Sequence, residues 1–575
     1  MGTDTLRRHM LNFSIETLKC FLGTNLVDTL IEWTPDNETL FTKTKLVDMI
    51  LAIHGINILK DKNFRATLLK TFTKDNIERL ASMLPASKKY QPNIMDMIEA
   101  IVDMPWRDNK VSKQLLTMLD IKADIFERIE VAGSAVNEIL SNDRFFELLD
   151  YQFVIKQRIL GNLNSEAELS RMLVHMPTGT GKTKTAMHTI CHYYNFSLEK
   201  PKLILWIAHT TELLQQAFDT FSSVWQHLGS GEITTYKLWG EHIFKDSDFD
   251  NGGIVFCGIQ KLMSLASTEP QIMEVLIKNC ALIVFDEAHK AAAAETRRTI
   301  EKFMLKKDDM CNRSLVGLTA TPGRFTELNV GNDLLASMFG NRMIEIDTEI
   351  MNSINMSKLE ALNASAESNI IAYFQEKRIL AQITKEQLTY PEGLSDKELK
   401  SVKRSAIGGG YDDFTSKQLE IIGRNKNRNL AIMCRLRELS RDKLPTIVFT
   451  CSVDHGKLLA SMLSLEGIPN ALVIGSMLPT DRANAIAAFK NRDNPTNIII
   501  NYEVLTTGFD STNIKCVFIT RPTKSVVLYS QMLGRGLRGP QMGGNEECLL
   551  IDIKDNLEKY DEELAFGHFN NYWKV

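Results

Sequence analysis

The segment Met172–Thr183, MLVHMPTGTGKT, decides the fold class of this chain of 575 residues. Its first part, Met172–Met176, is a short apolar run that predicts a buried strand, and its second part is a glycine-containing loop before a helix. Backbone N–H groups of such a loop surround phosphate oxygens, and the positive end of the following helix adds attraction. The usual pattern has a glycine where this chain has Met176. We nevertheless predict a phosphate-binding loop here.

The residues of this loop have distinct expected roles. Lys182 should reach the β- and γ-phosphates of a nucleotide, and the Thr183 hydroxyl should coordinate Mg²⁺. The predicted cofactors are therefore ATP and Mg²⁺. The residues expected to bind the nucleotide here are Pro177, Thr178, Gly179, Thr180, Gly181, Lys182 and Thr183.

Two carboxylates follow a second apolar run, Leu282–Phe285. At the end of a parallel strand beside a phosphate loop, Asp286 is expected to hold Mg²⁺ through water. Glu287 is expected to orient and deprotonate the attacking water. An isolated Asp-Glu pair is usually a solvated loop, but its position after a buried strand favours catalysis.

Three residues near these carboxylates are predicted to couple nucleotide state to the rest of the protein. His289 lies two positions after Glu287, and Thr319 and Thr321 follow the predicted strand Leu315–Leu318. Hydroxyl groups exchange hydrogen-bond partners at low cost. Taken alone, Thr319-Ala320-Thr321 is an ordinary loop, and only its place in the order of motifs favours a coupling role.

A third stretch, Gln531–Arg538 (QMLGRGLR), places Arg535 and Arg538 three residues apart. If the stretch is helical, this spacing directs both side chains to one target. Guanidinium groups stabilise the charge on a transferring phosphoryl group. Gln531, Arg535 and Arg538 therefore join Lys182, Asp286 and Glu287 as predicted catalytic residues, and hydrolysis requires two parts of the chain to close on each other.

The stretch Val504–Asp510 (VLTTGFD) follows another predicted strand. Gly508 permits a close backbone approach, and Asp510 is positioned to hold a ribose or a metal-bound water, so both are predicted to bind the nucleotide. Thr506 and Thr507 are predicted to donate to a nucleic-acid phosphate.

The pattern of apolar residues divides the chain into four parts. Residues 1–143 have helical spacing without convincing strand alternation, which predicts an all-helical domain. A faint repeat relates Leu46–Ile53 (LVDMILAI) to Ile94–Ile101 (IMDMIEAI), and Phe126–Ile129 echoes Ile77–Leu80. A small bundle is the simpler interpretation, and a module that docks a partner protein or nucleic acid is the alternative.

The rest of the chain alternates short apolar runs with helical stretches, which predicts the α/β class with two parallel-sheet lobes in tandem. The first lobe is expected at 144–345, a polar helical connecting or inserted segment at 346–425, and the second lobe at 426–575. The predicted strands are Met172–Met176, Leu203–Ala208, Ile254–Cys257, Leu282–Phe285, Leu315–Leu318, Thr446–Phe449, Leu472–Ile474, Asn497–Asn501, Cys516–Ile519 and Cys548–Ile551.

Composition excludes several classes of protein. Apolar residues make up 44% and charged residues 24%, and the net charge is -4, as in globular rather than disordered or fibrous chains. The nine cysteines include no C-x-x-C pair, which argues against zinc ribbons and favours a reduced, cytoplasmic location. No apolar run reaches the roughly 18 residues of a membrane span, and no secretory leader is expected.

The ordered motifs resemble those of superfamily 2 DEAD/DEAH-box helicases and translocases, over residues 144–560. The corresponding stretches are MPTGTGKT (motif I), LWIAHTTELLQQ (Ia), IVFCGIQKL (Ib), FDEAH (II), LTATP (III), TIVFTCSVDH (IV), VLTTGFD (V) and QMLGRGLR (VI). Arg521–Ser525 leading into motif VI is similar to the XPB/RadD-like and type III restriction-type branch. This chain lacks the cysteine-rich zinc region of RadD-like proteins.

The resemblance implies two RecA-like lobes, ATP hydrolysis and movement along nucleic acid, with DNA favoured over RNA. It also implies an adenine-binding glutamine before motif I, for which Gln152 is preferred and Gln157 is the competitor. The residues expected to contact nucleic acid are His209, Thr210, Gln260, Lys261, Thr450, Cys451, Ser452, Thr506 and Thr507.

The resulting hypothesis is a nucleic-acid-dependent ATPase of the helicase or translocase type, with a role in repair, restriction or phage defence by analogy alone. The alternatives are a helicase that acts on RNA, and a nucleotide-gated scaffold whose residues 1–143 recruit a partner protein. A nuclease is less favoured, because no metal-ligand cluster lies outside the motor motifs.

Overall fold

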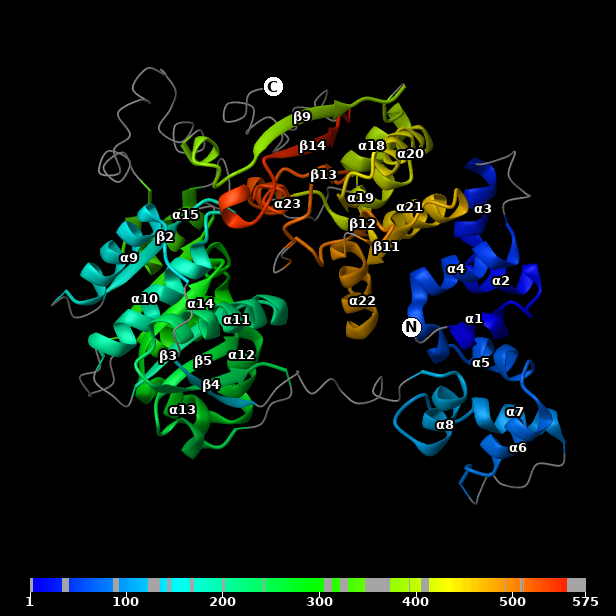
Figure 1. The fold of residues 1–575 in the computed structure, drawn as a ribbon, viewed down its shortest axis with the longest axis horizontal. Helices are drawn as coiled ribbons and strands as arrows, with labels where there is room; N and C mark the ends of the chain where they lie inside the picture. The colour runs from blue at the N-terminus through cyan, green and yellow to red at the C-terminus, as the bar shows by residue number, and fades with distance from the viewer. Residues whose placement is uncertain are drawn as a thin grey trace.

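The computed structural model describes most of the chain and arranges it in three parts (Figure 1). We call them the N-terminal domain (within 4–121), lobe 1 (within 135–346) and lobe 2 (within 373–555). In this described part no helix is long and apolar enough to cross a membrane. The described residues are 4–33, 41–85, 93–121, 135–141, 146–165, 170–198, 202–240, 244–304, 313–320, 329–346, 373–391, 393–404, 413–491, 493–506, 509 and 511–555.

Lobe 1 is built on an eight-stranded sheet with the order β1-β4-β5-β3-β6-β7-β2-β8. Its neighbouring strands are parallel except for β1 and β4, which pair antiparallel at one edge. The strands are β1 (Val136–Leu140), β2 (Arg171–His175), β3 (Leu203–Ala208), β4 (Glu232–Leu238), β5 (Gly253–Gly258), β6 (Cys280–Asp286), β7 (Ser314–Thr319) and β8 (Met343–Ile344).

Helices cover both faces of this sheet, because its central strands are apolar on both sides. Along β3, Ile204 and Trp206 belong to one buried cluster, whereas Leu205 and Ile207 belong to another on the opposite face. The lobe 1 helices are α9 (Asp150–Leu163), α10 (Lys182–Phe196), α11 (Thr211–Leu228), η5 (Asp246–Phe249), α12 (Ile259–Thr268), α13 (Pro270–Asn279), η6 (Ala288–Lys290), α14 (Ala294–Met304) and α15 (Asn329–Met338).

Lobe 2 contains a six-stranded, all-parallel sheet with the order β11-β12-β10-β13-β14-β9. Its strands are β9 (Gln382–Leu388), β10 (Thr446–Phe449), β11 (Asn470–Val473), β12 (Ile498–Asn501), β13 (Cys516–Ile519) and β14 (Glu547–Ile553). Its helices are α18 (Asp396–Arg404), α19 (Ser416–Gly423), α20 (Lys426–Arg441), α21 (Val453–Leu465), α22 (Pro479–Lys490), α23 (Val526–Leu533) and η7 (Pro540–Met542).

The predicted α/β class with two parallel-sheet lobes is confirmed, and each of the ten predicted strands coincides with an observed strand to within two residues at either end. Two expectations are wrong. The segment 346–425 is not only helical, because β9 completes the sheet of lobe 2. Residues 1–143 are not free of strands, because β1 extends the sheet of lobe 1. Both strands lie at sheet edges, where polar residues such as those of QITKEQL are tolerated.

The N-terminal domain is helical over its remaining described residues. Side-chain caps start several of its helices, as at Thr42, Asp61 and Thr73. The sequence repeat corresponds to α4 and α7, while Phe126–Ile129 lies outside the described residues. The elements are α1 (Asp4–Met10), α2 (Ile15–Leu22), α3 (Thr24–Trp33), α4 (Lys43–His54), η2 (Gly55–Lys60), α5 (Lys62–Leu69), α6 (Lys74–Ala81), α7 (Ile94–Val102) and α8 (Lys110–Met118).

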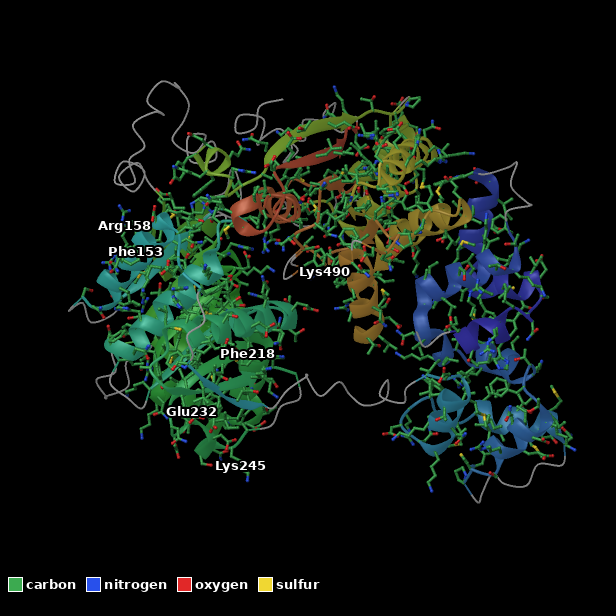
Figure 2. The ribbon with its side chains drawn as sticks, viewed as in Figure 1. Phe153, Arg158, Phe218, Glu232, Lys245 and Lys490 are labelled. Carbon is green, nitrogen blue, oxygen red and sulfur yellow. The ribbon has the colours of Figure 1, made fainter. Side chains whose placement is uncertain are left out.

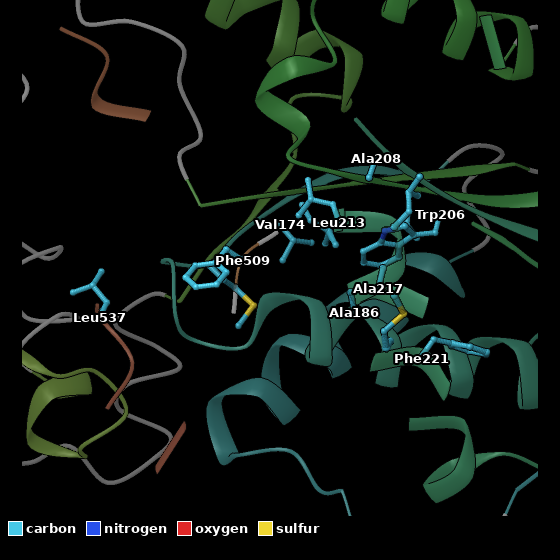
Figure 3. Close-up of a cluster of buried hydrophobic side chains, with 14 of the residues drawn as sticks. Val174, Ala186, Trp206, Ala208, Leu213, Ala217, Phe221, Phe509 and Leu537 are labelled. Carbon is cyan, nitrogen blue, oxygen red and sulfur yellow. The ribbon is translucent and has the colours of Figure 1, made fainter. Parts of the chain in front are cut away.

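Two buried clusters cross the boundaries between the three parts. One joins the core of the N-terminal domain to the α20–α21 side of lobe 2. The other joins lobe 1 to lobe 2, because Phe509 and Leu537 belong to the same cluster as Val174 and Trp206 (Figure 3). Lobe 2 therefore packs against both of the other parts.

Candidate nucleotide site between the lobes

The predicted phosphate loop connects β2 to α10, as expected. Gly179 (φ +88°) and Gly181 (φ +80°) have left-handed backbone conformations that a side chain would strain. Gly181 is the N-cap of α10, so the loop ends directly at the positive end of that helix. The backbone thus has the form that an anion-binding loop requires.

Lys182 at the start of α10 points to the two predicted carboxylates. Its Nζ lies 3.6 Å from Asp286 Oδ1 and 3.4 Å from Glu287 Oε1. Burial lowers the pKa of Lys182, but the two carboxylates raise it more, so its net pKa is raised and the ammonium group is retained. The structure therefore brings together the three residues that the sequence placed in one site.

The carboxylates end β6 in a tight turn. The backbone N–H of Glu287 donates to Asp286 Oδ1 at 3.0 Å, and Glu287 adopts φ +55°, which is unusual for a residue with a side chain. Burial raises the pKa of Asp286, whereas the neighbouring Lys182 ammonium lowers the same pKa. Burial also raises the pKa of Glu287, but Lys182 and His289 together lower it by more than burial raises it. The net pKa of Glu287 is therefore lowered, and its carboxylate is ionised.

A short chain of polar side chains leads away from Glu287. His289 Nδ1 lies 3.3 Å from Glu287 Oε2 and 3.4 Å from the hydroxyl of Thr319 at the end of β7. His289 and Thr319 are both buried. Thr321, the third predicted coupling residue, lies outside the described residues. Direct contacts thus connect Glu287 to the tip of β7.

The donor set at the loop fits a magnesium ion bound with a nucleotide. Asp286 is a buried carboxylate at the loop, and Thr183 follows the lysine. In the described residues no group of three or more His, Cys, Asp or Glu is arranged to hold a metal alone. Mg²⁺ in nucleotide sites takes one or two protein ligands and completes its shell with phosphates and water, so Thr183 and Asp286 are sufficient.

The condition that the stretch carrying the two arginines is helical is not met. Helix α23 ends at Leu533, and Arg535 and Arg538 lie in the turn and short bridge that follow. Two glycines, Gly534 and Gly536, interrupt the helix, because glycine is a poor helix former. Their three-residue spacing therefore does not place both side chains on one helix face.

Arg535 holds this turn to other residues of lobe 2. Arg535 donates from Nε to the carbonyl oxygen of Gln531 at 3.2 Å and from Nη1 to that of Phe509 at 2.5 Å. Gln531 is buried, and its Nε2 atom has no hydrogen-bond partner among the described residues. A buried, unpaired amide N–H group costs free energy unless a ligand accepts from it.

The turn after α23 touches the phosphate loop directly. A methyl group built on Gly534 would lie 2.1 Å from Thr178 Cγ2, and one built on Gly179 would lie 3.7 Å from Leu537 Cβ. These residues are more than 350 positions apart in the chain. The fold therefore brings motif VI of lobe 2 against motif I of lobe 1.

The preferred glutamine, Gln152, lies against the same loop. Its Nε2 donates to the carbonyl oxygen of Thr180 at 2.9 Å, and its Oε1 accepts from the backbone N–H of Leu149 at 3.0 Å. The competitor Gln157 is exposed on α9. Phe153 and Arg158, also on α9, lie at the periphery of the molecule (Figure 2).

Three residues of this region were not singled out from the sequence. Tyr151 donates its hydroxyl to the Thr180 carbonyl at 2.6 Å, Met542 Cε would lie 3.3 Å from a methyl group on Gly181, and Leu380 Cδ2 would lie 3.2 Å from one on Gly179. Leu380 and Met542 come from lobe 2, so only the tertiary arrangement reveals them. Tyr151 adjoins Gln152, which was the available clue.

The predicted nucleic-acid contacts fall into two groups. Gln260 is exposed, and His209, Thr210, Lys261 and Ser452 are partly exposed. Thr210 and Ser452 also cap helices, because their side chains accept from Leu213 N and His455 N respectively. Thr210 and Ser452 directly precede α11 and α21, and Gln260 and Lys261 lie in the first turn of α12.

Buried positions fit the prediction less well. The Thr450 hydroxyl lies 3.1 Å from the carbonyl oxygens of Ser452 and Asn501, Cys451 is fully buried, and Thr506 contacts the Glu503 carbonyl. In this structure Thr450 and Cys451 are therefore part of the core of lobe 2 and not surface contacts. Thr507, Gly508 and Asp510 lie outside the described residues.

Comparison with known families gives two matches along the chain. Residues 145–324 match the family described as "Type III restriction enzyme, res subunit", and residues 428–539 match "Helicase conserved C-terminal domain". The first match covers the phosphate loop and the carboxylates, and the second reaches both arginines.

Three curated relatives are similar to part of this chain. The putative ATP-dependent helicase IRC3 of Saccharomyces cerevisiae is 25% identical, over 67% of this chain and 48% of that protein. The type I restriction enzyme EcoAI endonuclease subunit of Escherichia coli is 24% identical, over 69% and 45%. The ATP-dependent DNA helicase MPH1 of Scheffersomyces stipitis is 28% identical, over 41% and 19%. The chain spans about half the length, or less, of these relatives.

Proposed function

We propose, from the premise that this chain is a superfamily 2 helicase-type protein whose lobe 1 matches the type III restriction enzyme family, that it is a nucleic-acid-dependent ATPase. Hydrolysis of ATP drives helicase or translocase movement, with DNA as the favoured polymer. The observation that carries the proposal is the contact of Gly534 with Thr178, because it places motif VI of one lobe on the phosphate loop of the other.

The residues of lobe 1 bind the triphosphate and activate water. Backbone N–H groups of Gly179–Thr183 and the Lys182 ammonium hold the phosphates, and Gln152 contacts the base. Bound Mg²⁺, held by Thr183 and Asp286, supplies charge neutralisation on the phosphate oxygens. Glu287 is ionised and accepts the proton of the attacking water.

The residues of lobe 2 complete the site only when the lobes are together. Arg535 and Arg538 stabilise charge on the transferring phosphoryl group, an effect of about 10³ to 10⁵ in rate for an arginine finger. The buried Nε2 group of Gln531 has no hydrogen-bond partner within the described part of the chain, which suits it to a phosphate oxygen or the attacking water. Gly508 and Asp510 are proposed to contact the nucleotide from the same lobe.

Nucleic acid acts on this chemistry through the surface near α11 and α21. The proposed contacts at His209, Thr210, Gln260, Lys261, Ser452, Thr506 and Thr507 bind phosphates without regard to sequence, as a motor requires. The chain Thr319–His289–Glu287 connects the tip of β7 to the catalytic carboxylate. A shift of β7 on polymer binding is thereby passed to Glu287.

The choice of DNA has support from the names of the relatives, which include a DNA helicase and a restriction enzyme subunit. The proposed location is the cytoplasm, as the scattered cysteines predict. Cell fractionation tests the location.

The test of the function is a steady-state ATPase panel with single- and double-stranded DNA and RNA. We expect DNA to raise kcat. If RNA raises kcat more than DNA does, RNA replaces DNA as the proposed polymer. If no polymer stimulates hydrolysis, the motor hypothesis is rejected and the nucleotide-gated scaffold is the remaining hypothesis.

A further inference from the structure

The N-terminal domain makes specific polar contacts with lobe 2. Asn57 Nδ2 donates to the Ser476 carbonyl at 3.1 Å, and the backbone N–H of Ile56 donates to Asp481 Oδ2 at 3.3 Å. At a second point Lys45 donates to the Leu465 carbonyl. Because the two parts also share one buried apolar cluster, they are joined along a continuous interface.

The backbone at position 55 lies so close to Asp481 that this position requires a glycine. Gly55 has φ +54°, and a methyl group built there would lie 2.2 Å from Asp481 Oδ2. Any side chain at this position would therefore both strain the backbone and displace the carboxylate. The start of η2 and the first turn of α22 therefore fit closely against each other.

The same turn of α22 also reaches lobe 1. Arg482, the residue after Asp481, donates from Nη1 to Glu212 Oε1 of α11 at 2.9 Å and from Nη2 to the Gly475 carbonyl at 3.3 Å. The Arg482 side chain is 20% exposed, so the ion pair is partly shielded from water. In Figure 1, α22 lies between α11 and the helices of the N-terminal domain.

We propose that the first turn of α22 is a brace through which the N-terminal domain favours the closed arrangement of the two lobes. Asp481 connects this turn to the N-terminal domain, and Arg482 connects it to Glu212 of lobe 1. The brace regulates the proposed ATPase and therefore rests on that function, since lobe closure brings motif VI to the phosphate loop.

The physical argument concerns the placement of Arg482. A long side chain loses conformational freedom when it is held in one geometry, and this cost offsets most of an exposed ion pair. Here the backbone that carries Arg482 is held by the N-terminal domain through Asp481 and Ser476. Glu212 is in the first turn of α11, where the helix dipole favours a carboxylate. Arg482 and Glu212 are thus each held in position before the ion pair between them forms.

The effect of the brace can be measured as the distance between the two lobes. This measurement does not require ATP hydrolysis. Cys434 is exposed on lobe 2, and Phe196 at the end of α10 is 74% exposed, so Phe196→Cys supplies a label site on lobe 1. Cys20 is also exposed and is replaced by Ser, as is Cys311, which lies outside the described residues. Single-molecule energy transfer in the full chain then reports the closed fraction.

Glu212→Gln is expected to lower the ratio of closed to open molecules about two- to fivefold, the range for an ion pair near the surface. Asp481→Ala and Asn57→Ala should shift it in the same direction, because the N-terminal domain then no longer positions Arg482. The combined exchange Glu212→Arg with Arg482→Glu should restore closure, which a role in folding alone does not predict. Asp103→Asn removes an exposed ion pair inside the N-terminal domain and is the matched control.

Basal and DNA-stimulated ATPase rates, measured with a poly-dT oligonucleotide, should follow the closed fraction in each variant. The proposal is overturned if Glu212→Gln leaves the closed fraction unchanged, if the charge exchange fails to restore it, or if Asp481→Ala and Asn57→Ala have no effect. If poly-dT and the other polymers fail to stimulate ATPase while the closed fraction responds as expected, the motor function fails and the brace stands.

Discussion

The contact between Gly534 and Thr178 allows a sharp test of the two-lobe site. Gly534 has φ -56°, a helical value that alanine adopts freely, so Gly534→Ala adds no backbone strain. Its methyl group would meet the Ser530 carbonyl oxygen of lobe 2 at 3.0 Å, and its closer contacts lie across the interface. The added methyl group would lie 2.1 Å from Thr178 Cγ2 and 2.8 Å from Thr178 Cβ. Thr178 cannot fully avoid it by rotating, because its Cβ atom is itself too close.

The expected loss follows from the cost of overpacking, about 1–3 kcal/mol. If this cost falls on lobe closure, kcat/KM for ATP decreases about five- to 150-fold, at 1.36 kcal/mol for each tenfold change. Steady-state ATPase with DNA present measures it, and thermal unfolding verifies that the variant is folded. Gly161→Ala is the matched control, because nothing lies within 4 Å of a methyl group there.

A second substitution distinguishes direct contact from a general defect. Thr178→Ser removes the Cγ2 atom and keeps the hydroxyl group, so it should restore part of the activity of Gly534→Ala, while the remaining Cβ contact at 2.8 Å keeps the rescue incomplete. The two changes are then coupled by more than about 1 kcal/mol in a double-mutant cycle. Unchanged activity of Gly534→Ala, or additive effects of the two changes, would refute the view that motif VI closes on the phosphate loop.

Three further predictions concern single residues. Lys182→Ala and Glu287→Gln should each lower kcat by about 10²- to 10⁴-fold, since one removes the phosphate-binding cation and the other the base; turnover at the parental rate in either variant would contradict the assigned site. Gln152→Ala should raise KM for ATP more than KM for GTP, and equal changes would show that Gln152 does not contact the base. Burial raises the pKa of Asp552 to about 7 from 3.8, so the unfolded chain loses this proton at lower pH than the folded chain does, and stability falls between about pH 4 and 7. Asp552→Asn should therefore stabilise the protein by roughly 4 kcal/mol at pH 8 and change little at pH 3, measured by urea denaturation; an equal shift at both pH values would contradict this pKa.

Local sequence patterns were sufficient for much of the fold. Fully buried strands such as β3, which is entirely apolar, and β10, which is apolar after Thr446, had their bounds predicted without error. The strands β1, β4, β8 and β9 were missed. Three of them, β1, β8 and β9, lie at sheet edges, and β1, β4 and β9 include polar residues that interrupt an apolar run. The helix expected to carry Arg535 and Arg538 ends early, because glycine residues weaken helices in a way that residue spacing alone does not show.

The sequence by itself determined the phosphate loop, the carboxylates after β6 and the class of sheet, because each depends on neighbours within a few residues of the chain. Only the tertiary structure decided that Gly534 meets Thr178, that Leu380 and Met542 cover the loop, and that Asp481 and Arg482 join all three parts. These contacts connect residues hundreds of positions apart, and their formation depends on how whole buried faces pack together. A local pattern carries no information about that packing.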